Sequence, residues 1–249
     1  RLAGLGYREL VLTGIEISSW GHDLKNGQGL IDLVEGICAA APECRVRLGS
    51  LEPRTITEDF CRRAAALPNL CPHFHLSMQS GCDATLKRMN RKYDSERYYE
   101  SVKLLRGHFD RPGITTDLIV GFPGETEEEF AQTLDFVRKC AFSALHIFPY
   151  SRRSGTPAAS MPGQVPRTEK EERAHRAAEV AAELRAAWLA GGIGRTAPVL
   201  FEEEKNGLWR GHAPDYTEVY AEGVGLHNVI KTVEMTEIHE NGWRGSVVK

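Results

Sequence analysis

Five short segments of the chain alternate between apolar and polar residues, and longer segments with a helical repeat of apolar residues separate them. A period of two is typical of β-strands, and a repeat of three to four residues is typical of amphipathic helices. Strands are predicted at Glu9–Ile15, Arg45–Glu52, His73–Gln79, Ile114–Phe122 and Ala144–Tyr150. Helices are predicted at Gly29–Ala41, Thr55–Leu67, Ala84–Tyr93, Asp94–Phe109 and Thr126–Ala141. Strands that alternate with helices predict an α/β fold with a parallel sheet.

Three of these helices carry a sequence signal at their first residue. Thr55 and Thr126 are each followed three residues later by a glutamate, which is the capping-box pattern. Asp94 can act as an N-cap, because its carboxylate can accept the free backbone N–H groups of the first turn. These signals predict where the three helices begin.

The two faces of the predicted strands differ in polarity. In the third strand, Phe74, Leu76 and Met78 share one face, whereas His73, His75, Ser77 and Gln79 share the other. The apolar sets of the other strands are Leu10/Leu12, Val46/Leu48, Thr116/Leu118/Val120 and Leu145/Ile147, and their polar sets include Thr13, Arg45/Arg47, Asp117 and His146/Phe148/Tyr150. A closed eight-stranded barrel usually fills its lumen with apolar side chains. The polar sets therefore predict an incomplete parallel (β/α) barrel whose lumen holds a polar ligand; the alternative is a doubly wound sheet with some buried polar residues.

The last third of the chain has a different sequence pattern. Pro166–Ala190 is predicted to be a long helix with a charged, solvated face. Residues 197–249 consist of short β-rich runs separated by Gly, Asn and Asp, which is typical of a small antiparallel β-barrel. A boundary near Gly192 divides the chain into two predicted domains, residues 1–192 and 193–249.

The overall composition excludes several classes of protein. Of the 249 residues, 41% are hydrophobic and 26% charged, with a formal net charge of −3, so any nucleic acid must be held by a local basic patch. No apolar run approaches the roughly 20 residues that span a bilayer. The first residues do not resemble a signal peptide. We therefore expect a cytoplasmic protein without a membrane partner.

The six cysteines do not form a recognisable metal or disulfide pattern. They are Cys38, Cys44, Cys61, Cys71, Cys82 and Cys140, and no two of them have C-x2-C spacing. Their scatter argues against a disulfide framework. We expect reduced thiols, with Cys38, Cys61 and Cys140 acting as small buried residues on helix faces, and no metal site within this chain.

Polar groups gather where the predicted strands end. In α/β barrels these carboxyl ends form the active site. The five ends read Thr13-Gly14, Ser50-Leu51-Glu52-Pro53, Gln79-Ser80-Gly81, Gly121-Phe122-Pro123-Gly124-Glu125 and Pro149-Tyr150-Ser151. Turns that combine glycine or proline with hydroxyl, amide or carboxylate groups can hold a small polar molecule through side chains and backbone N–H groups.

Cations follow two of these strand ends. They are Lys87, Arg88, Arg91 and Lys92 on the predicted helix Ala84–Tyr93, and Arg152 and Arg153 after the fifth strand. Such groups can hold phosphates. A solvated surface is the alternative for each of them taken singly.

With these segments in view, the chain resembles the radical S-adenosylmethionine (SAM) methylthiotransferases, and among them the MtaB type, which acts on threonylcarbamoyladenosine beside the tRNA anticodon. The matching motifs are LTGIEISSWG (12–21), RLGSLEP (47–53), PHFHLSMQSGCDATLKRMNRKY (72–93), TTDLIVGFPGETEEEF (115–130) and HIFPYSRRSGTPAASM (146–161). The resemblance implies a partial barrel of the radical SAM type, followed by a TRAM-like small barrel that faces RNA. It also implies SAM and two [4Fe–4S] clusters as cofactors.

The resemblance further implies roles for individual residues. By motif, the SAM contacts are Thr13, Gly14, Ser50, Glu52, Ser77, Gln79, Asp117, Gly121, Phe148 and Tyr150. The implied partners are the tRNA anticodon stem-loop and an electron donor that reduces the cluster. RNA contacts are expected from the six cations above and from Lys205, Arg210 and Arg244 of the small barrel. Residues 195–249 contain six Lys plus Arg and nine Asp plus Glu, a net charge of −3, so RNA contact there would have to be local.

One departure from the family is large. The C-x3-C-x2-C loop that binds the radical SAM cluster has no counterpart in this sequence, and Arg1-Leu2-Ala3 matches the helix just after that loop. We therefore expect a fragment without the N-terminal domain, the first barrel strand and its cluster loop. Because a cluster needs cysteine thiolates, the fragment alone is expected to be inactive and to contain no catalytic residue.

Three other functions compete with this interpretation. A methylthiotransferase acting on a ribosomal protein is compatible with the acidic small barrel, but the sequence motif HFHLSMQSGCD (73–83) argues against it. A non-catalytic RNA-binding module is compatible with the missing cysteines. A lyase or aldolase on a TIM-type barrel is disfavoured, because none of the predicted strand cores contains a lysine that could form a Schiff base.

Overall fold

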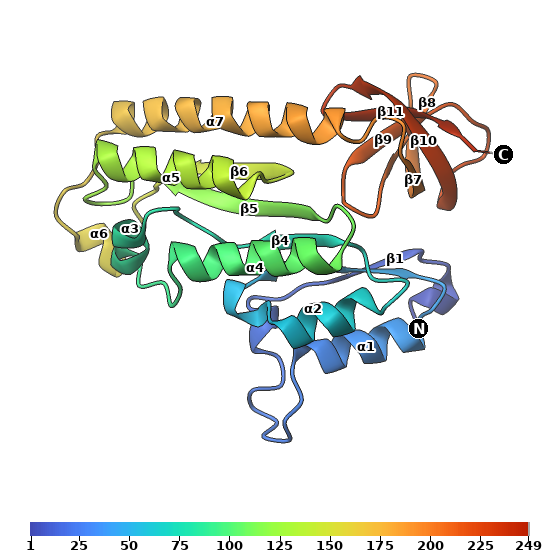
Figure 1. Cartoon of the computed structure of the whole chain (residues 1–249), viewed down its shortest axis with the longest axis horizontal. Coiled ribbons are helices and arrows are strands. Elements are labelled where there is room, and N and C mark those ends of the chain that lie inside the picture. The colour runs from blue at the N-terminus through green and yellow to red at the C-terminus, as the bar shows by residue number, and fades with distance from the viewer. Residues whose placement is uncertain (249) are drawn as a thin grey trace.

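The computed structural model describes residues 1–248 and shows two packed units joined by a long helix (Figure 1). The α-helices are α1 Leu30–Ala40, α2 Glu58–Ala65, α3 Asp83–Arg88, α4 Ser95–His108, α5 Glu127–Cys140, α6 Pro157–Ser160 and α7 Arg167–Ala190. The strands of the first unit are β1 Glu9–Leu12, β2 Arg45–Leu48, β3 Ser50–Leu51, β4 His73–Leu76, β5 Gly113–Val120 and β6 Ala144–Pro149. Those of the second are β7 Thr196–Lys205, β8 Leu208–His212, β9 Glu218–Ala221, β10 Val229–His239 and β11 Gly242–Val247.

Every strand pair of the first unit is parallel. β1 pairs with β2, and the four-stranded sheet has the order β3-β4-β5-β6. Gly49 separates β2 from β3, and a parallel bridge joins Val46 of β2 to Leu70, which precedes β4. The predicted α/β fold with an incomplete parallel barrel is therefore confirmed.

The apolar faces of the strands form the main core. Phe74, Leu76 and Met78 of the third predicted strand are fully buried, as are Val46 and Leu118 of its neighbours. They belong to one cluster with apolar side chains of α1, α2, α4 and α5, and the buried Ala177 and Val180 bring α7 into the same cluster. The helices thus cover one face of the sheet, and the polar sets of the strands lie on the opposite face. We call this opposite face the polar face.

Most element ends agree with the sequence signals, and the disagreements have local causes. Thr126 and Glu129 form the expected capping box, and Asp94 accepts the backbone N–H of Arg97. The predicted cap at Thr55 is wrong, because Pro53–Thr55 forms a 3-10 turn and Thr57 caps α2 by accepting the N–H of Phe60. The helix predicted at Ala84–Tyr93 is shorter, and a left-handed Asn90 (φ 57°) follows its end.

The second unit is a closed barrel with the strand order β10-β11-β9-β8-β7. Its neighbours are antiparallel except for β9 and β11, which run parallel. The predicted small barrel is present, and this parallel pair is the feature that the sequence pattern did not indicate. The predicted boundary between residues 192 and 193 lies in the turn between α7 and β7 and stays a prediction about domain division.

The end of α7 fixes the small barrel to the first unit. The indole N–H of Trp243 donates to the carbonyl of Leu189 at 2.8 Å, and Trp188 donates to the hydroxyl of Thr217 at 3.1 Å. Gly192 follows α7, and a Cβ atom there would overlap the Trp243 ring. In the part of the chain that the structure describes, no helix is long and apolar enough to cross a membrane.

Candidate functional site

A polar pocket lies at the carboxyl ends of β3 and β4. Its volume is about 380 Å³, which is within the range of small-ligand sites. Three of the residues expected to contact SAM line it: Ser50, Glu52 and Ser77. Five further residues line the same pocket. The sequence analysis assigned no role to Glu16, Arg54 and Tyr93, and it expected Arg91 and Lys92 to contact RNA. We call it the rim pocket.

Hydrogen bonds hold the walls of the rim pocket in place. The backbone N–H of Glu52 donates to the hydroxyl of Ser18 at 2.9 Å, and Arg54 pairs with the Glu52 carboxylate at 2.7 Å. The hydroxyl of Tyr93 donates to the carbonyl of Ser77 at 2.7 Å. Burial raises the pKa of Tyr93 to about 12, so this phenol keeps its proton and remains a donor.

A second, larger pocket adjoins the rim pocket. It has a volume of about 680 Å³ and contains Thr13 and Gly14, two further expected SAM contacts. The two pockets share Ile15 and Glu16. The expected contacts at the ends of β1, β3 and β4 therefore lie along one continuous edge of the sheet.

Two other expected contacts, Gly121 and Tyr150, meet α7 at a separate corner. The Lys170 ammonium donates to the carbonyl of Tyr150 at 3.0 Å, and its stem fills the space where a Cβ atom at Gly121 would lie. Gly121 has φ 70°, a conformation that favours glycine. Its N–H donates at 2.6 Å to the buried carboxylate of Glu125, which Arg173 pairs at 2.9 Å. The sequence did not indicate the roles of Lys170 and Arg173, because both are far away in the chain.

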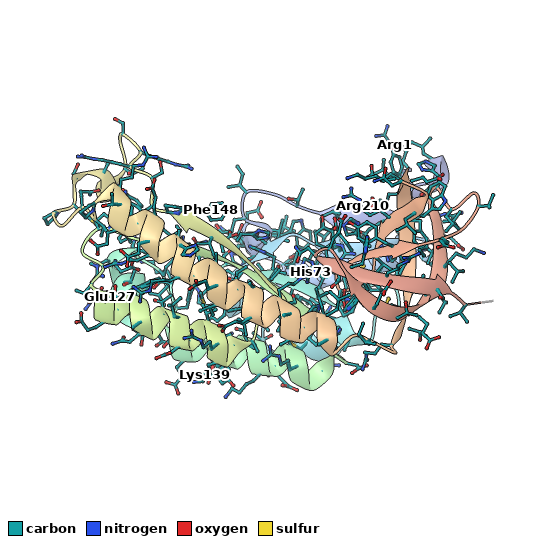
Figure 2. All side chains as sticks on the ribbon, turned by 90° about the horizontal axis from the view of Figure 1, so that it is seen from above. Arg1, His73, Glu127, Lys139, Phe148 and Arg210 are labelled. Atoms are coloured by element: carbon teal, nitrogen blue, oxygen red, sulfur yellow. The ribbon has the colours of Figure 1, made fainter. Side chains whose placement is uncertain are left out.

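Gln79, Asp117 and Phe148, the remaining expected SAM contacts, lie on or beside the central strands. Gln79 adopts φ 69°, and its backbone bonds to β5 on both sides, at Asp117 and Ile119. Phe148 stands opposite Ile119 in the register of β5 and β6 and is 51% exposed. Figure 2 shows that Phe148 lies away from the small barrel.

On the polar face, Asp117 belongs to a row of hydrogen bonds that crosses β4 and β5. Nε2 of His73 lies 3.2 Å from the Thr115 hydroxyl, which lies 3.0 Å from Nδ1 of His75. Nε2 of His75 lies 3.3 Å from the Asp117 carboxylate. The bond from His75 lowers the pKa of Asp117, so this carboxylate is ionised. Burial and the nearby Arg47 lower the pKa of His73 to about 3, so His73 is neutral.

The small barrel covers the lower part of the polar face, where β1 and β2 begin. Arg45 and Arg47 both pair with Glu9, at 2.6 and 2.8 Å, and both donate to backbone carbonyls of the small barrel or its loops. Burial opposes ionisation of Glu9, but the two guanidinium groups outweigh it and lower its pKa. The Tyr216 ring lies between His73 and His212, at 5.0 and 4.9 Å. Arg45 and Arg47, which were expected to face the lumen, therefore hold the two units together.

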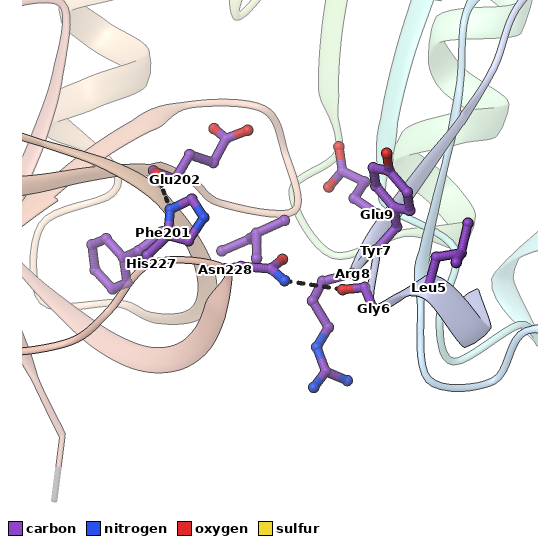
Figure 3. Close-up of a pocket in the computed structure, with 10 residues that line it drawn as sticks. Leu5, Gly6, Tyr7, Arg8, Glu9, Phe201, Glu202, His227 and Asn228 are labelled. Carbon is purple, nitrogen blue, oxygen red and sulfur yellow. Dashed lines mark hydrogen bonds between the residues drawn. The ribbon is translucent and has the colours of Figure 1, made fainter. Parts of the chain in front are cut away.

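A further pocket of about 360 Å³ separates the first residues of the chain from the small barrel (Figure 3). The Asn228 amide crosses it and donates to the carbonyl of Gly6 at 2.9 Å. His227 lies beside it, with Nδ1 2.7 Å from the carbonyl of Glu202. None of the expected site residues lines this pocket.

The cations expected to bind RNA fall into two groups. Arg88 pairs with Glu129, Arg210 with Glu203 and Glu218, and Arg244 with Glu222 and Glu237. The others are exposed and form no ion pair with residues 1–248: Lys87, Arg91, Lys92, Arg152, Arg153 and Lys205. Five of these six lie on loops or a helix that follow β4 and β6, and Lys205 ends β7 in the small barrel.

All six cysteines are buried free thiols. Burial raises the pKa of Cys61 and Cys71 to about 11 and that of Cys140 to about 12. Within residues 1–248, no three His, Cys, Asp or Glu side chains form a group that could hold a metal ion. These residues therefore do not fit an iron–sulfur cluster, and we derive no step through one.

The comparison with known families agrees with the fold. Residues 1–137 match the model of the radical SAM superfamily. The chain therefore belongs to this superfamily, as the motifs at the strand ends predicted.

The curated relatives are more specific. The chain is 39% identical to threonylcarbamoyladenosine tRNA methylthiotransferase MtaB of Thermotoga maritima over 240 residues, 95% of this chain and 54% of that protein. It is 34% identical to the MtaB of Chlamydia pneumoniae over 245 residues, 98% of this chain and 58% of that one. It is also 39% identical over 201 residues to the tRNA-2-methylthio-N(6)-dimethylallyladenosine synthase of Desulfitobacterium hafniense, 81% of this chain and 45% of that protein. The chain thus spans about half the length of the curated relatives it matches.

Solved structures support the fold alone. Coproporphyrinogen III oxidase of Escherichia coli superposes with a TM-score of 0.55 and 19% identity, covering 72% of this chain and 40% of that one. The radical SAM methyltransferase TsrM of Kitasatospora setae has a TM-score of 0.51 and 19% identity, covering 64% of this chain and 31% of that one. Both are described as radical SAM enzymes, and the likeness confirms the partial barrel.

The residues of the rim pocket fit SAM chemically. SAM carries an ammonium group, a carboxylate and a ribose, and the pocket offers carboxylates, cations and hydroxyl groups from neighbouring strand ends. The carboxylates of Glu16 and Glu52 are suited to the ammonium group. Arg54 and Arg91 are suited to the carboxylate, and the hydroxyls of Ser50 and Ser77 to the ribose.

Proposed function

We propose that the protein takes part in tRNA methylthiolation, adding a methylthio group to C2 of N6-threonylcarbamoyladenosine next to the anticodon. One observation carries this proposal: the similarity to the MtaB of Thermotoga maritima extends over 240 residues and includes both the parallel sheet and the small barrel. Methylthiolation of a ribosomal protein is not favoured, because the relatives named above act on tRNA by their names.

We propose that SAM binds along the edge formed by β1, β3 and β4. When bound, SAM supplies the deoxyadenosyl radical and the methyl group. Glu16 would hold the ammonium group, and Glu52 and Arg54 would hold the ammonium group and the carboxylate once the ion pair between them opens. Ser50 and Ser77 would hold the ribose, while Thr13 and Gly14 close the adjoining pocket. Tyr93 orients the end of β4 through its bond to the carbonyl of Ser77. The corner of Gly121, Tyr150 and Lys170 is proposed to receive the adenine.

We propose that the tRNA anticodon stem-loop approaches the same end of the sheet. The cations with no ion pair among residues 1–248 support this, because most of them follow β4 and β6, whose carboxyl ends lie at this edge. Arg88, Arg210 and Arg244 would first have to break ion pairs with glutamates, so they contribute less. Such a tRNA-modifying role implies a cytoplasmic location, with which the six free thiols agree.

The 249-residue chain by itself is proposed to be inactive, because its described residues offer no group of ligands for a cluster. An electron donor that reduces the cluster is proposed as a further partner of the active enzyme. Anaerobic iron–sulfur reconstitution of this chain should give no stoichiometric [4Fe–4S] absorbance. A full cluster signal would contradict this part of the proposal.

The substrate is tested in the cell. The gene encoding this chain is disrupted, total tRNA is digested to nucleosides, and the digest is analysed by mass spectrometry. The expected result is loss of the methylthio form of threonylcarbamoyladenosine and accumulation of the unmethylthiolated nucleoside. Loss of methylthiolated dimethylallyladenosine instead would indicate the activity named for the Desulfitobacterium hafniense relative. An unchanged nucleoside composition would contradict the proposal.

A further inference from the structure

The row of hydrogen bonds on the polar face has a direction. The nitrogen of His73 can donate to the Thr115 oxygen, the Thr115 hydroxyl can donate to Nδ1 of His75, and Nε2 of His75 then donates to Asp117. This arrangement satisfies all three contacts, and the low pKa of His73, which keeps that ring neutral, agrees with it. Every proton in the row then points toward Asp117. The carboxylate becomes its final acceptor and keeps further lone pairs for a ligand.

The row changes from covered to open along the polar face. His73 is 6% exposed and lies under Tyr216, whereas the Asp117 side chain is 29% exposed and His146 and Phe148 are exposed. The His146 ring lies 5.8 Å from that of His75, and its nitrogens bond to no residue within 1–248. An acceptor, a histidine that can donate or accept, and an aromatic ring thus surround one open area. We call it the upper polar face.

Tyr216 marks the lower limit of this area. It is a bulky residue at φ 70°, a backbone conformation that is rare outside glycine and occurs at functional sites. Its ring is 51% exposed, although Arg47, His73 and His212 contact it. The small barrel therefore contributes an aromatic floor beside the polar row. Aromatic rings with polar groups between them are the usual means of holding an unstacked base.

We propose that the upper polar face is the surface that receives the N6 substituent of the target adenosine, a role that replaces the SAM contact expected for Asp117, and that Asp117 and His146 select a polar substituent over an apolar one. This inference rests on the function proposed above. A threonylcarbamoyl group carries N–H and O–H donors that can bond to Asp117, and acceptors that can bond to His146. A dimethylallyl group has none of these and would leave both side chains unpaired. Sites built to bond a polar group reject analogues that lack it much more strongly than apolar pockets reject small changes.

The test measures discrimination between two RNAs. Two fluorescent anticodon stem-loops are prepared that differ only in the substituent at the target adenosine, threonylcarbamoyl or dimethylallyl. Their dissociation constants for the 249-residue chain are measured by anisotropy. The variants are Asp117→Leu and His146→Leu, and the matched control is His175→Leu, an exposed histidine on α7 whose ion-pair partner is Glu179. Thermal unfolding followed by circular dichroism verifies that each variant is folded.

The wild-type chain should bind the threonylcarbamoyl RNA more tightly, and each of the two variants should reduce that preference by about tenfold, the value of one well-placed hydrogen bond. The control should keep the full preference. Because His146 is exposed, His146→Leu should fold, and it tests the inference even if Asp117→Leu does not fold. An unchanged preference, or an equal loss of affinity for both RNAs, would overturn this inference and leave the proposed function standing. Failure of the wild-type chain to bind either RNA would overturn the inference together with the proposed RNA contact.

Discussion

The two ends of the polar face both carry polar or charged side chains, but their environments are opposite. At the lower end, Arg45 and Arg47 are buried, pair with the partly buried Glu9 and donate to carbonyls of the small barrel or its loops. At the upper end, Asp117 and His146 lie open. Both ends come from strands with one apolar and one polar face. The pattern therefore identifies the face that ligands or partners can use, and the element packed against it decides which end is an interface and which is a site.

The largest effect is expected at the lower end of the polar face, which the small barrel covers. Arg47→Leu removes both bonds to Glu9 and the bonds to the carbonyls of Ala213 and Pro214. Because it replaces a buried guanidinium and leaves the partly buried Glu9 carboxylate with one partner fewer, we expect a loss of about 3–5 kcal/mol in the free energy of unfolding, measured with urea. Arg138→Leu, which breaks an exposed pair with Asp135, is the control and should cost less than about 1 kcal/mol. Equal losses in the two variants would show that the interface is not held by this network.

The second prediction concerns acid stability of the covered end. The folded pKa of His73 is lowered from 6.5 to about 3. Below pH 6.5 the unfolded chain therefore takes up a proton that the folded chain does not, and stability falls as the pH falls toward 3, by about 1.4 kcal/mol per pH unit from this group. His73→Gln should remove this contribution. Urea unfolding of both proteins between pH 4 and 7 measures the two slopes, and parallel slopes would contradict the prediction.

The open end should tolerate substitution better. Asp117→Asn weakens the bond with His75 but leaves no buried charge, since the carboxylate is partly exposed. We expect a loss of less than about 1 kcal/mol in the free energy of unfolding. A loss as large as that of Arg47→Leu would mean that the upper polar face is also part of the structural framework.

The smallest effect is expected for single cations at the surface. Arg91→Gln removes a cation with no ion pair among the described residues, so the slope of log affinity against log salt for anticodon stem-loop RNA should fall by about one. Arg244→Gln removes a cation that Glu222 and Glu237 already neutralise, and it should leave the slope unchanged. The reverse result would move the RNA contact from the edge of the sheet to the small barrel.

Local chemistry explains what could be predicted from the sequence. Alternation in Phe74–Gln79 and its counterparts placed the apolar faces correctly, because burial of these side chains against helices dominates the energy of the sheet. The caps at Asp94 and Thr126 were also correct, since a cap depends on residues three positions apart. The cap at Thr55 failed because Pro53 begins a 3-10 turn and displaces the start of α2 to Glu58.

The sequence by itself determined the parallel sheet, the small barrel, the family and the strand ends at which polar groups gather. Only the tertiary structure showed that Arg45 and Arg47 face the small barrel, that Lys170 covers Gly121, and that Tyr216 covers His73. These contacts join residues 49 to 167 positions apart. Periodicity and capping report on neighbours within a few residues, whereas a contact of this kind depends on how whole elements pack.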